Sequence, residues 1–303
     1  MMFSGARELG AYQDEPPQLP SGSFGKNAML RLGFEPGPHR SVLRTLHRRA
    51  PLIVQQALYW DEEMPGLPCV SIISNAGGIL QGDRNIIEID MAADAQAHVT
   101  TQSATRIHEM DANYASQTQQ LTLGPSSYLE YIPRPIIPHK NSRFIQATRI
   151  SIDPTATLVY SEIMMPGRKY YGDGEVFQYK LFSSTVEGAR PDGTSLFTEK
   201  FVLEPGVNDL ARMGVMGDFH VFGNVIVLTP KENADALFEL VTPAFDAENE
   251  IAYGASRLPN DAGIIFKVLA METAPVMAKI REFWSTAREI AAGHKVPENF
   301  LWA

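Results

Sequence analysis

The chain has almost none of the residues that build disulfides and membrane spans. It has one cysteine, Cys69, among 303 residues, which excludes intrachain disulfides and thiolate metal clusters and fits a reducing compartment. No apolar run approaches the roughly 18–20 residues that a membrane span needs, and the N-terminus lacks the basic-then-apolar pattern of a signal peptide. We therefore expect a cytoplasmic protein with no membrane association, in which Cys69 is a buried packing residue.

Basic charge is also scarce. The chain carries 26 Lys and Arg against 35 Asp and Glu, a formal net charge of −9, which argues against a general nucleic-acid binder. One basic patch is present, but it has no interleaved aromatic side chains for base stacking, so we interpret it as a solvated turn and strand face; it comprises Arg40, Arg44, His47, Arg48 and Arg49. An acidic surface is compatible with the handling of cations.

Signatures of catalysis are missing as well. The seven histidines form no His-x-His or His-x-x-x-His pair, so no structural zinc site is indicated. There is no Gly-x-Ser-x-Gly motif for a serine nucleophile. The glycine-rich stretch at residues 74–84 does not fit a nucleotide loop, because Asp83 stands where Lys and Ser or Thr would meet phosphate and magnesium. These absences favour a scaffold or chaperone over an enzyme.

That glycine-rich stretch is the feature around which the chain is organised. It follows the apolar run Cys69–Ile73 and precedes Ile86–Met91, whose alternation of apolar and acidic residues is typical of a half-buried strand. Its three glycines, Gly77, Gly78 and Gly82, supply positive φ or close backbone approach between two strands.

Asp83 and Arg84 follow these glycines at the start of the second strand. A charged pair at this place can face inward or toward a partner. The spacing equally allows a tight strand connection with a surface ion pair.

The middle of the chain repeats itself. Residues 89–100, 121–131 and 150–160 each show the pattern strand, short turn of small residues, strand, and a weaker echo follows at residues 201–206. A fixed period of about 30 residues is typical of stacked supersecondary units that cannot bury their apolar faces alone. We predict a β-rich (α+β) protein, with a body that is a short twisted β-superhelix or pair of sheets.

The predicted organisation has three parts. Residues 1–26 form a flexible leader, residues 27–206 the β-repeat body, and residues 207–303 an α+β portion packed on that body as one structural unit. Two helices belong to the C-terminal third, one starting at Pro230 and one capped by Thr273 and closed by Gly293.

Further strands are predicted in the body at Asn27–Phe34, Leu52–Tyr59, Val176–Phe182 and Ser195–Phe201. A second glycine-rich turn that carries charge lies between the third repeat and the strand predicted at Val176–Phe182. It begins after Glu162 and contains Gly167, Arg168 and Glu175.

Several of these segments, taken in order, resemble one family. They are Asn75-Ala76-Gly77-Gly78 with Gln81-Gly82-Asp83, then residues 100–105, residues 129–133, Tyr160-Ser161-Glu162, Gly167-Arg168 and Glu175-Val176-Phe177. The chain resembles the UreD family, called UreH in some bacteria, over about residues 27 to 300. These are urease accessory proteins that help to load nickel into apo-urease. The chain departs from the family in having Asn75-Ala76 where members usually have Pro before the paired glycines.

The resemblance implies a β-rich fold with two helices, no enzymatic activity and no tightly bound cofactor. It implies a scaffold that docks on apo-urease and binds UreF, which recruits the GTPase UreG, in an assembly with UreF that can be dimeric. It further implies transient passage of Ni²⁺ through the protein. We expect Asp83, Glu175 and Glu162 to serve that passage, and the turn residues to serve the loops or a partner; these are Gly77, Gly78, Gly82, Arg84, Gly167 and Arg168.

Two other functions remain open at this point. One is a carbohydrate-active β-superhelix enzyme that uses paired carboxylates such as Asp83 and Glu162; an aromatic content of 9% without clustered Trp or Tyr weakens it. The other is a generic protein-interaction module. For Asp83 and Glu175, the alternative to a nickel role is that both are exposed turn carboxylates.

Overall fold

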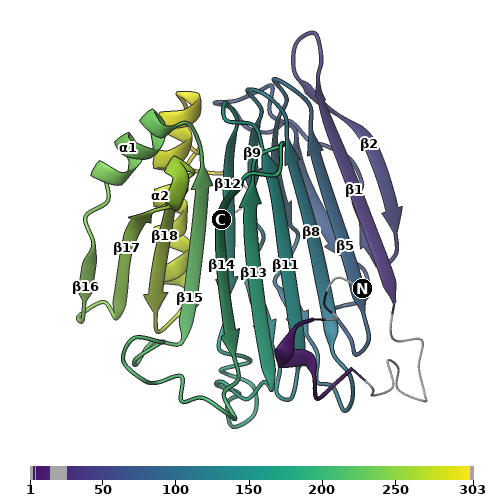
Figure 1. Cartoon of the computed structure of the whole chain (residues 1–303), viewed down its shortest axis with the longest axis vertical. Coiled ribbons are helices and arrows are strands. Elements are labelled where there is room, and N and C mark those ends of the chain that lie inside the picture. The colour runs from purple at the N-terminus through teal and green to yellow at the C-terminus, as the bar shows by residue number, and fades with distance from the viewer. Residues whose placement is uncertain (1–2, 4, 14–25, 301–303) are drawn as a thin grey trace.

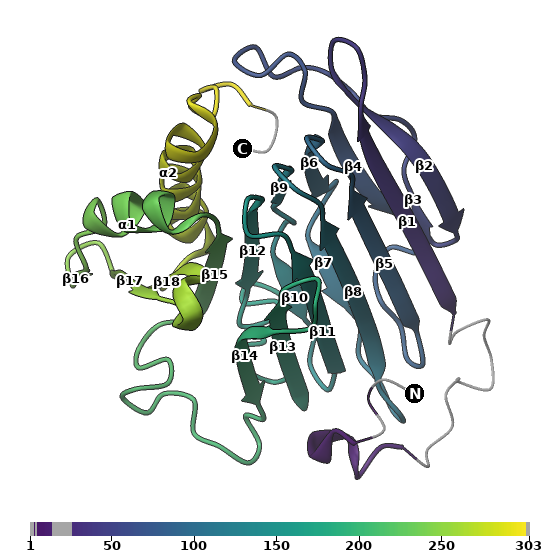
Figure 2. The same cartoon turned by 45° about the horizontal axis from the view of Figure 1, so that its top comes forward.

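The computed structural model describes residues 3, 5–13 and 26–300 as two large β-sheets with two α-helices against the second sheet (Figures 1 and 2). The first sheet has seven strands in the order β14-β13-β11-β8-β5-β1-β2. Its bounds are β1 Asn27–Pro36, β2 Ser41–Arg49, β5 Arg84–Met91, β8 Ala115–Leu123, β11 Arg143–Ile152, β13 Leu181–Ala189 and β14 Ser195–Leu203. The five inner strands run parallel, and β2 and β14 pair antiparallel at the edges.

The second sheet has the order β16-β17-β18-β15-β12-β9-β6-β4-β3. Its parallel part consists of β4 Cys69–Ser74, β6 Gln96–Thr101, β9 Tyr128–Tyr131 and β12 Thr157–Met164. Its antiparallel part consists of β15 Val221–Leu228, β18 Gly263–Ala270, β17 Ile251–Arg257 and β16 Ala244–Asp246, and β3 Leu52–Ile53 lies at the other edge. Two short strands, β7 Thr105–Ile107 and β10 Ile136–Pro138, pair beside the main order.

Successive strands alternate between the sheets and generate the superhelix. Each coil consists of one strand in the first sheet, a tight turn of small residues, a strand in the second sheet and a short third strand, as in β5-β6-β7 and β8-β9-β10. The next coil stacks on it in parallel register, with Ile89 opposite Leu121 and Leu121 opposite Ile150. These are the repeats at residues 89–100, 121–131 and 150–160, so the predicted β-superhelix with two sheets is confirmed.

Helix α1 Lys231–Glu239 and helix α2 Thr273–Ala292 cover the outer face of the second sheet. The buried face of α2 includes Val276, Ile280 and Phe283, which pack with outward-facing strand residues such as Val159 and Val225. Gly293 ends the helix in the left-handed conformation, as predicted, whereas the N-cap is Glu272 and not Thr273. No helix of the described residues is long and apolar enough to cross a membrane.

Three local predictions are wrong. Of the strand predicted at Leu52–Tyr59, only Leu52–Ile53 is a strand, with an isolated bridge at Leu58. The strand predicted at Val176–Phe182 begins only at Leu181, because Phe177 has a positive φ of 53° that breaks an extended chain. The echo at residues 201–206 is the end of β14 followed by a turn, and no further coil stacks there.

Most of the predicted leader, residues 1–26, lies outside the described residues, as do the last three residues of the C-terminal portion. Within the described part of the leader, Arg7–Leu9 form a short 3-10 helix. Leu9 is buried and packs against Tyr114, Ile145 and Leu181. This turn is therefore attached to the first sheet.

Candidate functional site

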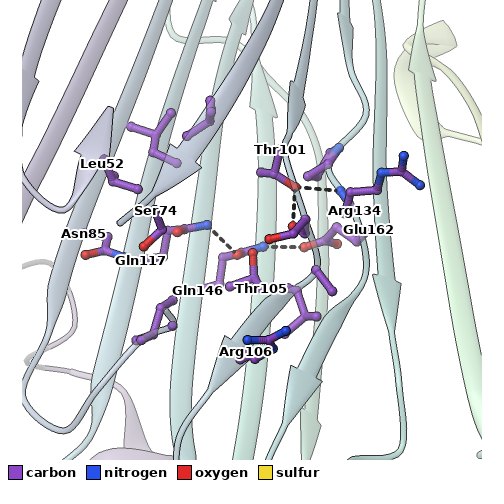
Figure 3. A pocket seen from close by; sticks show the side chains of 18 of the residues that line it. Leu52, Ser74, Asn85, Thr101, Thr105, Arg106, Gln117, Arg134, Gln146 and Glu162 are labelled. Atoms are coloured by element: carbon purple, nitrogen blue, oxygen red, sulfur yellow. Dashed lines mark hydrogen bonds between the residues drawn. The ribbon is translucent and has the colours of Figure 1, made fainter. Parts of the chain in front are cut away.

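A cavity of about 120 Å³ lies in the space between the two sheets. Its lining includes Asn85, Gln117 and Gln146 from the first sheet and Tyr160 and Glu162 from the second. The volume has room for several water molecules or a partly hydrated cation. Figure 3 shows the side chains of both sheets converging on it.

A row of polar side chains forms the wall on the first sheet. The parallel register places Asn85 opposite Gln117, Gln117 opposite Gln146, and Gln146 opposite Ser184. Gln117 Nε2 donates to Gln146 Oε1 at 3.1 Å. The same strands are apolar further along, where Ile89 and its neighbours form the main core. The superhelix thus repeats a polar side chain at one inward position of each coil.

Glu162 lies on the opposite wall, on β12, and is 6% exposed. Its Oε1 accepts hydrogen bonds from Gln146 Nε2 at 2.6 Å and from Ser184 Oγ at 2.8 Å. Burial raises the pKa of Glu162, and the polar side chains around it, those of Ser184, Tyr160, Gln146 and Asn224, offset this only in part. Glu162 is the one carboxylate that the described residues contribute to the lining.

Three oxygen atoms of the lining have no hydrogen-bond partner within the described residues. They are Glu162 Oε2, Asn85 Oδ1 and Gln119 Oε1. A buried acceptor without a donor is costly, so water or a cation has to meet these oxygens. Carboxylate and amide oxygens together are ligands for hard and borderline divalent cations.

The rim of the cavity is glycine-rich and positively charged. Gly77 and Gly78 line it, together with Thr101, Arg106 and Arg134. Thr101 Oγ1 accepts the backbone N–H of Arg134 at 2.9 Å (Figure 3). Because guanidinium groups pair with carboxylates, the exposed Arg106 suits an acidic surface of another protein.

Asp83, predicted to serve nickel passage, does not line the cavity. It is 1% exposed, so it is not an exposed turn carboxylate either. Its Oδ1 accepts the backbone N–H of Lys26 and its Oδ2 that of Leu80, each at 2.9 Å. Asp83 holds the glycine-rich turn to the start of β1.

Arg84 and Gly82 fasten the same turn to the next coil. Arg84 Nη1 donates to the carbonyl of Tyr114, Nη2 donates to Asn113 Oδ1 at 2.8 Å, and the guanidinium lies over the Tyr114 ring. Gly82, at φ 77°, donates its N–H to the Tyr114 carbonyl at 3.2 Å. Neither the predicted surface ion pair with Asp83 nor a free partner-binding Arg84 is present in this described segment.

Glu175 and Arg168 face each other in the second glycine-rich turn, outside the cavity lining. Arg168 Nε donates to Glu175 Oε2 at 2.7 Å, and Arg168 Nη2 contacts the other oxygen. The hydrogen bond from Arg168 lowers the pKa of Glu175. Glu175 is 8% exposed and also accepts the N–H of Lys140. A Cβ at position 167 would lie 2.1 Å from the Glu175 carbonyl oxygen, so Gly167 permits the turn to close.

Of the predicted site residues, the structure therefore brings together Glu162, Gly77 and Gly78. A nickel role for Asp83 and Glu175 stays a prediction. Sequence reasoning missed the amide row, although one signal was available: Asn85, Gln117 and Gln146 each stand four residues before a predicted repeat. The predicted pairing of Asp83 with Glu162 in a glycosidase site finds no second carboxylate in this lining.

A second buried polar cluster lies on the other face of the second sheet. Arg288 of α2 donates to both oxygens of Glu130 at 2.7 and 2.8 Å and also contacts Asp61. His98 Nδ1 lies 2.8 Å from Glu130 Oε2. Cys69 is buried nearby, as predicted, and burial raises the pKa of its thiol to about 12. This cluster fixes α2 to the sheet and has no access to the cavity lining.

Among the described residues, no group of three or more His, Cys, Asp or Glu side chains could hold a metal ion. The fold and the site thus define a class: a β-superhelical protein with an interior cavity of oxygen acceptors and no preformed metal cage in its described part.

Comparison with known proteins identifies the family. The family described as UreD urease accessory protein matches residues 26–303. A protein of Brucella suis biovar 1 named Urease accessory protein UreD 2 is 70% identical over 302 residues, covering 100% of both chains. A protein of Yersinia pseudotuberculosis named Urease accessory protein UreD is 53% identical over 297 residues, covering 98% of this chain and 92% of its own. The chain belongs to the UreD family of urease accessory proteins, and its role is in urease maturation.

Proposed function

We propose that this protein is a non-enzymatic cytoplasmic scaffold for urease maturation, which binds apo-urease and UreF, recruits UreG through UreF, and passes Ni²⁺ through its interior cavity. The observation that carries the nickel step is Glu162, a buried carboxylate in the cavity lining whose Oε2 has no hydrogen-bond partner among the described residues. Asn85 and Gln119 add two buried amide oxygens that also have no hydrogen-bond partner among the described residues.

These donors suit transfer rather than storage. Ni²⁺ accepts oxygen ligands, but its tight sites use imidazole or thiolate, and the cavity lining offers neither. One carboxylate with neutral amides and retained water holds a divalent cation weakly enough to release it. Tight binding inside the scaffold would instead compete with the urease active site for the metal.

The positive rim supports docking at the cavity mouth. The exposed Arg106 would repel a free cation that arrives from solvent, so entry through this mouth needs a partner whose acidic side chains cover it. Docking would then connect the cavity to the partner and neutralise the positive charge at the cavity mouth in one step. We assign this face to a protein partner of the maturation complex, in an assembly with UreF that can be dimeric.

Co-expression tests the scaffold. In cells that carry the urease genes but lack this one, urease should be made as inactive apo-protein, and the full chain should restore activity. The affinity-tagged chain should recover UreF and apo-urease together. A folded chain that recovers neither partner would contradict the proposal.

A charge-reversal variant tests whether a partner docks at the rim of the cavity. Arg106→Glu reverses the charge of an exposed side chain and should weaken recovery of one partner without unfolding the chain. Arg149→Glu, on the exposed face of β11, is the matched control and should recover both partners normally. Equal recovery with both variants would contradict docking at the rim.

A further inference from the structure

His108 and His139 occupy the same corner of neighbouring coils. His108 directly follows β7 and His139 directly follows β10, and these strands pair in parallel with Ile107 opposite Pro138. The backbone N–H of His108 bonds to Ile79 and that of His139 to Ile107, each at 2.9 Å. The ring centroids are 4.9 Å apart, with planes at 69°.

This spacing fits two imidazoles that share one metal ion. With a metal–nitrogen distance of about 2.1 Å, each ring centroid lies about 3.2 Å from the metal. Two such rings are about 4.5 Å apart at an octahedral angle and about 5.2 Å apart at a tetrahedral angle. The observed 4.9 Å lies between these two values.

Both rings are available as ligands. Within the described residues, no hydrogen bond to either imidazole competes with a metal. His139 is 6% exposed.

The surrounding chain holds the pair in place. Asn141 Nδ2 donates to Glu109 Oε1 at 2.7 Å and ties the two corner loops together. Gly78 packs beneath His108, because a Cβ at position 78 would lie 2.6 Å from His108 Nε2. Gly78 also lines the cavity, so the pair lies directly behind the cavity rim.

We propose that His108 and His139 together bind one borderline divalent cation, of the class of Ni²⁺, Co²⁺ or Zn²⁺, with water completing its coordination. The described residues offer no third ligand of the His, Cys, Asp or Glu type, and Glu175 nearby is held by Arg168. Binding is therefore weak and reversible. A role as a nickel station beside the cavity rests on the proposed function, whereas the binding itself does not.

Titration calorimetry with NiCl₂, and the visible absorption of added Co²⁺, test the site on the full chain. One equivalent should depend on the pair: His108→Ala or His139→Ala should each weaken its binding at least tenfold, because either change destroys the chelate, and weak binding at Glu162 should be unchanged. His47→Ala removes an exposed histidine on β2 and is the control. Gly78→Ala keeps both imidazoles but displaces His108, and it should weaken binding as well.

Wild-type protein that binds no Ni²⁺ or Co²⁺, or a His108→Ala variant that binds as wild type does, would overturn the proposal. His108 is only partly buried, so this variant folds even if His139→Ala does not, and thermal unfolding verifies it. Failure of the proposed function would show differently, as normal nickel loading of urease by Glu162→Gln. That result would leave metal binding by the histidine pair unchanged.

Discussion

Two buried glutamates on neighbouring strands provide a matched test of what each carboxylate does. Glu130 lies on β9 and is 0% exposed, and Glu162 lies on β12 and is 6% exposed; the two strands pair in parallel. Glu130 faces α2 and Arg288, whereas Glu162 faces the cavity. We expect Glu130→Gln to destabilise the fold strongly and Glu162→Gln to leave it intact.

The expected loss of folding stability in Glu130→Gln follows from the ion pair between Glu130 and Arg288. Burial alone would raise the pKa of Glu130, but Arg288 and His98 outweigh it and hold that pKa well below 4.5. A depressed pKa contributes stability that is present above the ordinary pKa and lost as pH falls through the folded value. Removing one partner of a buried ion pair costs about 3–5 kcal/mol. Asp61 still contacts Arg288, so we expect about 3 kcal/mol.

The pKa of Glu162 is shifted in the opposite direction to that of Glu130. Burial raises its pKa, so the folded chain holds this proton more tightly than the unfolded chain, and stability falls as pH rises from the ordinary pKa to the raised one. Glutamine keeps the acceptor for Gln146 and Ser184 but carries no charge. The free energy of unfolding of Glu162→Gln should therefore stay within about 1 kcal/mol of wild type or rise.

Urea unfolding at pH 7.5 measures both variants. The urea concentration at the midpoint of unfolding should fall for Glu130→Gln and stay at the wild-type value for Glu162→Gln. The dependence of the unfolding free energy on urea concentration should be the same in both variants. If Glu162→Gln loses as much stability as Glu130→Gln, the Glu162 carboxylate is a structural group and is not available to a cation in the cavity. A loss below about 1 kcal/mol for Glu130→Gln would refute the assignment of the Arg288 cluster as the attachment of α2.

Three further outcomes are expected. Asp83→Ala should lower the free energy of unfolding by about 1–3 kcal/mol, because two backbone N–H groups lose their acceptor; a loss near 0.5 kcal/mol in urea unfolding would instead be that of an exposed carboxylate. Gly167→Ala should lower the free energy of unfolding by about 1–3 kcal/mol, because its Cβ overlaps the Glu175 carbonyl, and should make residues 167–175 sensitive to limited proteolysis. A variant that resists proteolysis as well as the wild-type chain would contradict the close contact. The pKa of Glu162 is raised, so acidification should inhibit in vitro activation of urease at a higher pH than protonation of an exposed glutamate would. Glu162→Gln should flatten this dependence of activation on pH. An identical pH profile for the wild-type chain and Glu162→Gln would count against a role for this carboxylate.

The superhelix was predictable because its signal is local. Each coil turns at a cluster of small residues, such as Ala92–Ala95, between two alternating segments. The short strands β7 and β10 have three residues each, too few to show alternation, so no pattern predicted them. The predicted strand at Val176–Phe182 fails because positive φ at Phe177 is imposed by the closed turn and not by propensity.

The cavity could be predicted only in part. Glu162 was selected, but its partners Gln117 and Gln146 become neighbours only when the coils stack in register. The Arg288 cluster is harder still, since Arg288 and Glu130 lie 158 residues apart. Asp83 and Glu175 were selected because they lie beside glycines, and the structure adds that their oxygens accept hydrogen bonds from backbone N–H groups and from Arg168. Their role in nickel passage stays a prediction. Sequence shows which residues carry charge, and packing decides which charges stay available.

If Ni²⁺ reaches urease through the cavity that Glu162 lines, the metal content of urease depends on this carboxylate. Urease should be purified from cells grown at limiting nickel with the wild-type chain, Glu162→Gln, or the control Glu187→Gln, which changes an exposed carboxylate on β13. We expect UreF and apo-urease to be recovered equally with all three chains. Nickel per urease active site, measured by mass spectrometry of the metal, should fall several-fold with Glu162→Gln alone. Equal nickel content in the three urease samples would show that Ni²⁺ does not depend on Glu162 to reach urease.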